Sequence, residues 1–293
     1  NTNDYIQYVN DKIQNAVVML DTKTGAVRAV NGGRKQTTLL GYNRATDNSR
    51  STGSTIKPVI DYGPAIEYLN YSTGQTIMDQ RTTYSNGVEL NNWDFSHKGA
   101  MTLRTALVYS RNTTALQTFK AVGETNIKSF LNNLDIQIKN DGQDYLVESN
   151  SIGADISPIK MAAAYATFGN YGTYSKPYTV RKVTTRDGQV TEFKPEQKQA
   201  MKDSTAYMIT DVLKDSFKYG FATQAAIPGL PTAAKTGSSN YTVEQKRAMG
   251  ASDYEDIIPD SWFIGYSTDY TISAWTGYDN PYEQGGGVDT TEQ

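Results

Sequence analysis

Hydrophobic and polar residues alternate in short runs at both ends of the chain. Residues 15–20 and 26–30 are β-rich runs, and the segment between them, 21–25, supplies turn residues. This pattern predicts a β-hairpin. Strand character returns near the other end in residues 231–237, 261–266 and 270–278. We therefore predict one antiparallel sheet assembled from both ends of the chain.

The middle of the chain has a helical pattern, with apolar residues recurring at i, i+3 and i+4. The predicted helices are 102–109, 113–122, 125–134, 158–168 and 204–217. A second hairpin is predicted from 179–185 and 189–193, which flank Asp187-Gly188. Residues 76–94 and 136–156 are predicted to be loops.

The remaining segments are polar or short. Residues 1–14 are predicted to be an amphipathic lead-in, 31–50 to be irregular, and 241–260 to be either a mobile flap or a disordered surface loop. The tail, 283–293, resembles the start of a truncated C-terminal helix from Asp289. We predict one α/β (α+β) domain over 1–293, with a sheet lobe from 1–53 and 231–282 and a helical lobe from 54–230.

Composition excludes several kinds of function. With 293 residues, 38% hydrophobic and 20% charged, the chain is an ordinary globular sequence. The net charge of -3, without a basic block, argues against nucleic acid as a partner. The absence of cysteine excludes thiolate chemistry, and the single histidine, His97, cannot form a histidine metal cluster. We therefore predict no metal and no cofactor, and any membrane anchor is expected outside this chain.

One short stretch suggests nucleophilic chemistry. Ser54 and Lys57 are three residues apart, so a helix places them on one face, with the amine able to reach the hydroxyl. That pairing sets a base beside a nucleophile. Gly53 suits a tight approach turn, and Pro58 places the helix start close to Ser54. The alternative is a serine that caps a helix while its lysine points to water.

Two further motifs complete the equipment for acyl transfer, which needs a proton relay and a cationic strand edge. Ser110-Arg111-Asn112 offers a hydroxyl and an amide at a junction between helices. Lys235-Thr236-Gly237-Ser238 offers an ammonium, two hydroxyls and a glycine that allows close approach.

Each motif also has a second occurrence that fits a purely structural role. Ser157-Pro158-Ile159-Lys160 is typical of a helix N-cap followed by proline. Lys23-Thr24-Gly25 lies in the predicted hairpin turn. Ser238-Ser239-Asn240 overlaps the third motif and cannot act apart from it.

The three motifs at 54, 110 and 235 follow the order and context of the penicilloyl serine transferases. Three longer phrases extend the likeness: 51–58 (STGSTIKP), 161–168 (MAAAYATF) and 262–266 (WFIGY) after the third motif. The chain resembles, over nearly its whole length, the transpeptidase domain of Gram-positive, streptococcal-type class A penicillin-binding proteins. The resemblance implies the β-lactamase/transpeptidase-like fold, with a sheet of about five strands flanked by helices.

The resemblance also implies a role for each motif residue. Ser54 would attack the penultimate D-alanine carbonyl of a stem peptide, and Lys57 would take the serine proton. Lys57 must then be neutral, which burial and the charge of Lys235 favour. Ser110 would relay the proton to the leaving amine, and Asn112 would hold the donor-peptide amide and orient Lys57.

Substrate binding is implied for the third motif. Thr236 and Ser238 would bind the carboxylate beside Gly237, and the backbone N–H groups of Ser54 and Ser238 would form the oxyanion hole. Arg111 should point away from the site and has no assigned role. The implied partners are donor and acceptor stem peptides, β-lactams, and an N-terminal glycosyltransferase domain of the full-length protein. The implied location is the outer face of the cytoplasmic membrane.

Alternatives remain open at this stage. A serine β-lactamase needs a deacylation base such as the glutamate of Glu-x-x-Leu-Asn, whereas Glu148 and Asp155 lie in a different setting and Glu67-Tyr68-Leu69-Asn70 is one residue short. A D,D-carboxypeptidase and a β-lactam sensor share all three motifs. Asn112 is also a good N-cap for the next helix. Trp93 and His97 either rim the cleft or face solvent.

Overall fold

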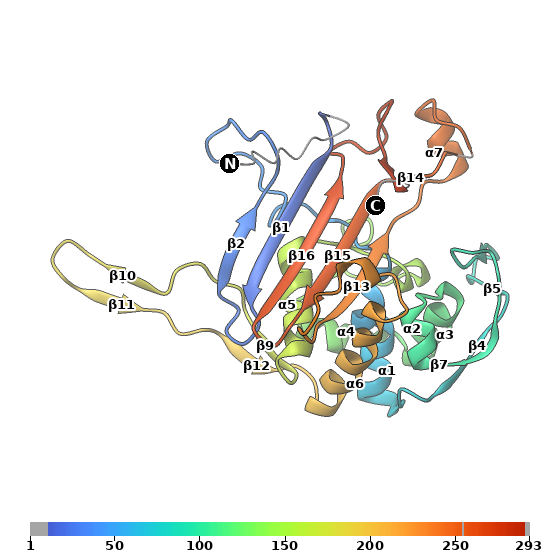
Figure 1. The fold of residues 1–293 in the computed structure, drawn as a ribbon, viewed down its shortest axis with the longest axis horizontal. Helices are drawn as coiled ribbons and strands as arrows, with labels where there is room; N and C mark the ends of the chain where they lie inside the picture. Colours follow the sequence, from blue (N-terminus) through green and yellow to red (C-terminus); the bar gives the residue numbers. More distant parts are fainter. Residues whose placement is uncertain (1–10, 254, 291–293) are drawn as a thin grey trace.

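A five-stranded antiparallel sheet forms the centre of the molecule (Figure 1). The computed structural model describes residues 11–253 and 255–290. The strands lie in the order β13 (Ala233–Ser238), β15 (Asp260–Tyr266), β16 (Tyr270–Gly277), β1 (Gln14–Asp21) and β2 (Val27–Asn31). The sheet predicted from both ends of the chain is therefore confirmed, with β1 paired to β16 along its whole length.

The inner face of the sheet is covered by helices (Figure 1). Side chains alternate along β1, so that Ala16, Val18 and Leu20 are fully buried. They join the core beside α5 (Pro158–Gly169), in which almost every residue is buried. A helix that is apolar on all sides belongs inside a protein, and α5 is held between the sheet and α6 (Asp203–Lys214).

All five helices predicted from the apolar spacing are present, with ends within a few residues of the expected ones. Besides α5 and α6 these are α2 (Leu103–Val108), α3 (Asn112–Val122) and α4 (Glu124–Asn133). The helix after Ser54 consists of η1 (Gly53–Ile56), η2 (Pro58–Tyr62) and α1 (Gly63–Leu69). The buried rings of Tyr62 and Phe130 pack in the core between these helices.

The predicted loops contain short strands that the sequence pattern did not indicate. In the first loop β4 (Thr76–Asp79) pairs with β7 (Gly99–Thr102), and β5 (Thr82–Thr83) pairs with β6 (Glu89–Leu90). The second loop contains η3 (Glu148–Ser151) and β8 (Asp155–Ile156), which pairs with β3 (Arg50–Ser51). Strands of two to four residues are too short to establish an alternating pattern, so these loop predictions were wrong.

Two more short ladders were missed for the same reason. They join β9 (Thr173–Ser175) to β12 (Gln197–Gln199), and β14 (Ile257–Ile258) to β17 (Val288–Asp289). Asp289 is thus in a strand. The predicted lead-in over 1–10 and the end of the tail, 291–293, lie outside the described residues.

Two surface segments differ in how well they were predicted. The second hairpin is confirmed as β10 (Lys182–Thr184) and β11 (Val190–Glu192), with Gly188 at φ +84°, and it projects from the body (Figure 1). Residues 241–260 were predicted to be a flap or loop. They contain the short helix α7 (Val243–Ala248) and strand β14. A reciprocal capping box between Thr242 and Gln245 begins α7. In the described part of the chain, every helix is too short or too polar to cross a membrane.

Candidate active site

Ser54 lies in a tight turn at the start of its helix, as predicted. Gly53 has φ +50°, a left-handed conformation that glycine adopts without strain, and Ser54 follows in the 3₁₀ turn η1. Pro58 has no N–H to continue an α-helical ladder, and the chain passes through the π-helical turn η2 before α1 begins. Trp262 Nε1 donates to Ser51 O at 2.8 Å, which ties the approach to the sheet.

The side chain of Lys57 is fully buried and points to the second motif. Its Nζ donates to Ser110 O at 2.7 Å, to Ser110 Oγ at 3.3 Å and to Asn112 Oδ1 at 2.7 Å. Among the described residues no hydrogen bond joins Lys57 to Ser54 Oγ, so the direct contact predicted from the spacing is absent. Lys57 Nζ is directed instead at three acceptors of the Ser110–Asn112 segment.

Lys235 reaches the same hydroxyl from the sheet. It is buried on β13, and its Nζ donates to Ser110 Oγ and to Thr236 O, both at 2.9 Å. Ser110 has φ +54°, and this left-handed residue turns the chain sharply between α2 and α3. The Ser110 hydroxyl thus lies between two amines that come from the first and the third motif.

Burial lowers the pKa of both amines. Burial, then the charge of Lys235, lowers the pKa of Lys57 well below its usual value, and Arg111 adds to this effect while Asp61 opposes it. Burial lowers the pKa of Lys235 to about 7. A neutral amine can accept a proton, and a lowered pKa is what a lysine base requires.

The backbone of the third motif lies directly against the turn of the first. A methyl group on Gly53 would lie 2.3 Å from Ser238 O and 2.8 Å from Ser238 N, and one on Gly237 would lie 2.7 Å from Thr55 N. Only glycine permits this approach. This close approach brings together the segments that carry the N–H groups of Ser54 and Ser238. Thr236 is half-buried and Ser238 is exposed.

Asn112 of the second motif does not cap the helix α3. Arg111, not Asn112, occupies the N-cap position of α3, and the Asn112 side chain makes no capping bond there. Asn112 Nδ2 instead donates to Asn91 O at 2.8 Å, which leaves Oδ1 facing Lys57. The N-cap alternative for Asn112 is therefore wrong. Arg111 is turned to Asp79 and Asp94, as expected for a residue that points away from the site.

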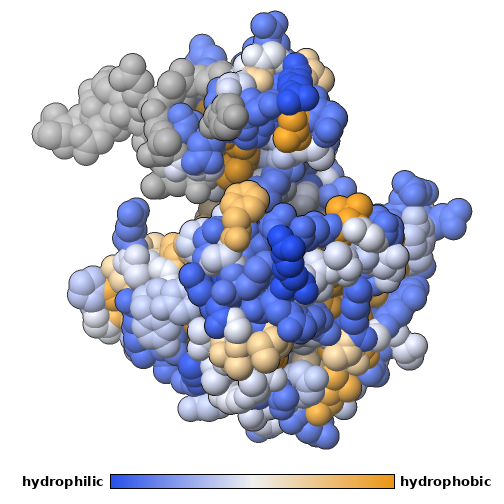
Figure 2. Space-filling model, turned by 90° about the vertical axis from the view of Figure 1, so that its right-hand side faces the viewer, coloured by the Kyte–Doolittle hydropathy of each residue, from blue (hydrophilic) through white to orange (hydrophobic). Residues whose placement is uncertain are grey.

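Aromatic side chains stand beside this motif. Trp93 is half-exposed, packs edge-on against Phe221 at 5.3 Å between ring centroids, and donates from Nε1 to Tyr109 O at 3.1 Å. Phe221 and Val108 also line a small crevice next to Lys235 and Thr236. Figure 2 views the molecule from this side, where a hollow separates the part around α7 and β14 from the part below it. His97 is not in this group, since its Nδ1 is 3.8 Å from Asp79 Oδ1.

The second occurrences of the motifs do not assemble. Ser157 is the N-cap residue of α5 with Pro158 at its first position, and Lys160 is exposed. Lys23 and Gly25 lie in the turn between β1 and β2, with Gly25 at φ +74°. These predictions are confirmed. In the described residues no three potential metal-binding acids or histidines cluster together.

Four further residues near the site were not predicted. Asp61 is fully buried one turn after Lys57, and its carboxyl oxygens have no hydrogen-bond partner among the described residues. Burial raises the pKa of Asp61 well above its usual value. Arg50 Nε donates to Asp260 Oδ1 at 2.8 Å just before the Ser54 turn, and Asp79 supports the Ser110 turn. In the sequence, only the position of Asp61 one helical turn after Lys57 could have indicated one of these residues.

The fold and the three-motif site define the chain as a member of the penicilloyl serine transferases. The family described as "Penicillin binding protein transpeptidase domain" matches residues 15–291, and the chain belongs to it. The family and the fold predicted from the sequence are thereby confirmed.

Relatives of known name place the chain near Gram-positive class A proteins. It is 43% identical over 271 residues to "Penicillin-binding protein 1A/1B" of Bacillus subtilis, covering 90% of this chain and 29% of that protein. It is 40% identical over 289 residues to "Penicillin-binding protein 1A" of Streptococcus pneumoniae, covering 96% of this chain and 40% of that protein. The chain thus spans less than half the length of these relatives.

Solved structures support the fold. The penicillin-binding protein PonA1 from Mycobacterium tuberculosis superimposes with a TM-score of 0.79 at 23% identity, over 93% of this chain and 71% of that one. The same protein in complex with penicillin V gives a TM-score of 0.81 at 22% identity, over 96% and 73% of the two chains.

Proposed function

We propose that this chain is a D,D-transpeptidase that cross-links peptidoglycan stem peptides through an acyl-enzyme on Ser54. The observation that carries the proposal is the Ser110 hydroxyl, which accepts hydrogen bonds from Lys57 at 3.3 Å and from Lys235 at 2.9 Å. Three segments far apart in sequence meet at one proton-carrying oxygen beside a serine in a tight turn. Structural roles for the separate motifs do not require such convergence.

In the proposed acylation, Ser54 Oγ attacks the carbonyl of the penultimate D-alanine. The serine proton passes to the neutral amine of Lys57, which must first exchange one of its present contacts for Ser54 Oγ. The tetrahedral oxyanion lies between the N–H groups of Ser54 and Ser238, and such donors are each worth about 3 to 4 kcal/mol. When the intermediate collapses, the C–N bond breaks, Ser110 delivers its proton to the departing D-alanine amine, and Lys57 passes the proton taken from Ser54 to Ser110.

Carboxylate recognition is assigned to Thr236 and Ser238. Both hydroxyls lie on the β13 edge beside the buried charge of Lys235, so the terminal carboxylate of the donor would meet donors and a cation together. Asn112 orients Lys57 through its Oδ1. Gly237 allows this strand to lie against the Ser54 turn.

The full-length protein is proposed to act outside the cytoplasmic membrane. The relatives are much longer than this chain, which supports an additional N-terminal glycosyltransferase domain and an anchor elsewhere in the protein. Donor and acceptor stem peptides are the proposed substrates. β-Lactams are the proposed covalent inhibitors.

Intact-protein mass after penicillin treatment tests the central claim. The wild type should gain the mass of one penicilloyl group that persists, and Ser54→Ala should gain none. Ser157→Ala is the matched control, because Ser157 has the same spacing to a lysine, and it should be labelled like the wild type. An adduct on Ser54→Ala would refute the assignment.

Persistence of the adduct distinguishes a transpeptidase from a β-lactamase. Glu148, the glutamate in the expected region, is occupied by Ser85 and by Lys120 at 3.1 Å. A carboxypeptidase is tested with a thioester stem analogue and a D-amino acid acceptor. Exclusive hydrolysis at high acceptor concentration would contradict transfer.

A further inference from the structure

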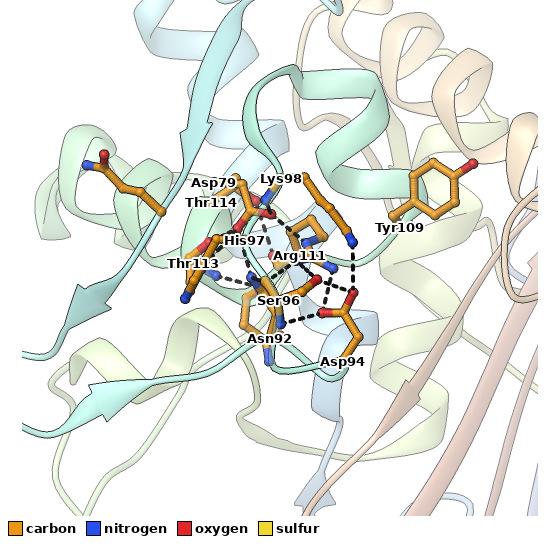
Figure 3. Close-up of polar contacts among 12 residues, drawn as sticks. Asp79, Asn92, Asp94, Ser96, His97, Lys98, Tyr109, Arg111, Thr113 and Thr114 are labelled. Atoms are coloured by element: carbon orange, nitrogen blue, oxygen red, sulfur yellow. Dashed lines mark hydrogen bonds and ion pairs between the residues drawn. The ribbon is translucent and has the colours of Figure 1, made fainter.

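A buried carboxylate lies behind the second motif. Asp79, at the end of β4, is fully buried and receives hydrogen bonds on both oxygens (Figure 3). Arg111 Nε and Lys98 N donate to Oδ2, each at 2.9 Å. Thr113 Oγ1 donates to Oδ1 at 2.6 Å, and Asn92 Nδ2 donates to the same oxygen at 2.8 Å. Asp79 therefore connects β4, the loop 92–98 and the start of α3.

The carboxylate is held in its charged form. Burial by itself raises the pKa of Asp79, but the hydrogen bonds from Thr113, Lys98 N and Asn92, together with the charge of Arg111, outweigh burial and lower it. Arg111 also pairs with Asp94 at 2.9 Å and donates to Ser96 O. The residue between Ser110 and Asn112 is thus anchored by two carboxylates and a backbone carbonyl.

The network fixes the orientation of one amide. Because Asn92 Nδ2 donates to Asp79 Oδ1 and to Ser96 O at 2.9 Å, its Oδ1 must face the other way. There it accepts from Asn112 N at 2.7 Å and from Thr113 N at 3.3 Å. These are the first N–H groups of α3, which have no partner within the helix.

The neighbouring residue orients the catalytic amide in the same way. Asn91 O accepts from Asn112 Nδ2 at 2.8 Å, so Asn112 Oδ1 is directed to Lys57 Nζ at 2.7 Å. The segment 91–92 therefore holds both the backbone and the side chain of Asn112. If this segment shifted or the amide turned over, Asn112 would present an N–H group to the amine of Lys57.

We propose that Asp79 and Asn92 are positioning residues for acylation of Ser54. Asp79 fixes Asn92, Asn92 and its neighbour fix Asn112, and Asn112 aims the Lys57 amine. This inference rests on the proposed function and adds two residues that lie outside its three motifs. Neither residue touches the substrate in this scheme; they act through the geometry of the base.

Three variants test the chain of contacts. Asp79→Asn removes the charge and replaces one of the two accepting oxygens by an NH2 group, so either Asn92 and Thr113 or Arg111 and Lys98 N lose their acceptor. Asn92→Asp sets two carboxylates against each other but keeps acceptors for the α3 N–H groups. The double exchange, Asp79→Asn with Asn92→Asp, restores a carboxylate-to-amide hydrogen bond in the reversed direction.

Labelled penicillin gives two separate measurements for each variant. The end point of labelling reports the fraction of protein that is folded and competent, whereas the rate at saturating penicillin reports the acylation step. Misplacement of a catalytic group by about 1 Å can cost 100-fold in rate. Each single variant should acylate about 10- to 100-fold more slowly with an unchanged end point, and the double exchange should recover part of the rate.

A control separates positioning from stability. Thr22→Val removes a buried hydrogen bond to Thr271 at 2.9 Å, just after β1 and beside the last residue of α5, and it should lower stability without changing the acylation rate. Should Asp79→Asn yield no folded protein, Asn92→Ser decides, because it keeps the pair of Asp79 and Arg111 and removes only the bridging amide.

The outcomes are distinct. A reduced end point with a wild-type rate in the single variants, or no recovery in the double exchange, would mean a purely structural network and would overturn the inference. Absence of a persistent adduct on the wild type would instead refute the proposed function itself.

Discussion

Lys57, which follows the Ser54 turn, and Lys235, on strand β13, donate hydrogen bonds to one oxygen, Ser110 Oγ, at 3.3 Å and 2.9 Å. Two ammonium groups this close repel each other in a buried site, so their protonation is coupled. Loss of a proton from either amine relieves the repulsion. The charge of Lys235 thereby helps to lower the pKa of Lys57, as the proposed role of a lysine base requires.

Removal of the Lys235 charge should move the pH dependence of acylation. In the proposed mechanism acylation requires neutral Lys57, so the acylation rate should rise with pH through the pKa of Lys57. Lys235 lowers that pKa. In Lys235→Gln the pKa of Lys57 should rise, so the rising part of the pH–rate curve should shift to higher pH. Lys235→Arg keeps the charge, so the curve should stay in place while the rate falls. Penicillin labelling rates between about pH 6 and about pH 10 measure both; identical curves would contradict the coupling.

Asp61 should make the wild type less stable, relative to Asp61→Asn, as pH rises. The folded-state pKa of Asp61 is raised above its unfolded value of 3.8. The contribution of Asp61 to the free energy of unfolding is therefore complete below pH 3.8. It is lost as pH rises towards the folded-state pKa, by up to about 1.4 kcal/mol per pH unit. Urea unfolding at about pH 4 and about pH 7 should show a growing advantage for the variant. Acylation should be nearly unchanged, and a large loss would indicate an ionised Asp61.

Loss of Arg50 should destabilise the approach to Ser54. Asp260 is almost fully buried, and without Arg50 its side-chain donors among residues 11–253 and 255–290 are Trp275 Nε1 at 2.9 Å and Ser239 Oγ at 2.7 Å. We expect Arg50→Ala to lower the free energy of unfolding by about 2 to 3 kcal/mol. Lys35→Ala, which removes an exposed ion pair with Asp11, is the control and should have no measurable effect. Equal effects in urea unfolding would argue against burial as the cause.

Gly53→Ala should slow acylation strongly because of crowding, and Gly188→Ala provides the comparison. Both glycines have positive φ, +50° and +84°, but a methyl group on Gly53 would meet Ser238 O at 2.3 Å, whereas one on Gly188 would meet nothing within 4 Å. Gly188→Ala should cost only about 1 kcal/mol in stability and label normally. Gly53→Ala should label at least about 100-fold more slowly. Similar labelling of both variants would show that the Ser238 contact is unimportant.

Periodicity predicted those elements that are long enough to show it. The strands of the central sheet and the helices from α2 to α6 each contain a repeated apolar pattern, and their ends agree with the structure to within a few residues. Strands such as Thr82–Thr83 and Arg50–Ser51 are fixed by pairing with distant residues, as in the register of Arg50 with Ile156. Sequence spacing carries no information on such partners.

The candidate site shows the same division. Ser54, Lys57, Ser110, Asn112 and Lys235 were found because they occur in short motifs, and the structure brings the last four into direct contact. The direction of the Lys57 side chain depended on the Ser110 carbonyl, which a pattern of side chains does not reveal. Asp79 and Asn92 lie in a predicted loop, where nothing in the sequence separates a buried acid from an exposed one.

The pairing of β1 with β16 also sets the order in which the protein can fold. Gln14 pairs with Gly277 and Asp21 with Tyr270, so the centre of the sheet closes only when both ends of the chain are present. Contacts between residues so far apart in sequence form slowly, because a long loop must close first. β13, which carries Lys235, joins the sheet through β15 and β16. A nascent or truncated chain without β16 would therefore have its serine but not the assembled pair of amines, so chemical competence should appear late in folding and all at once.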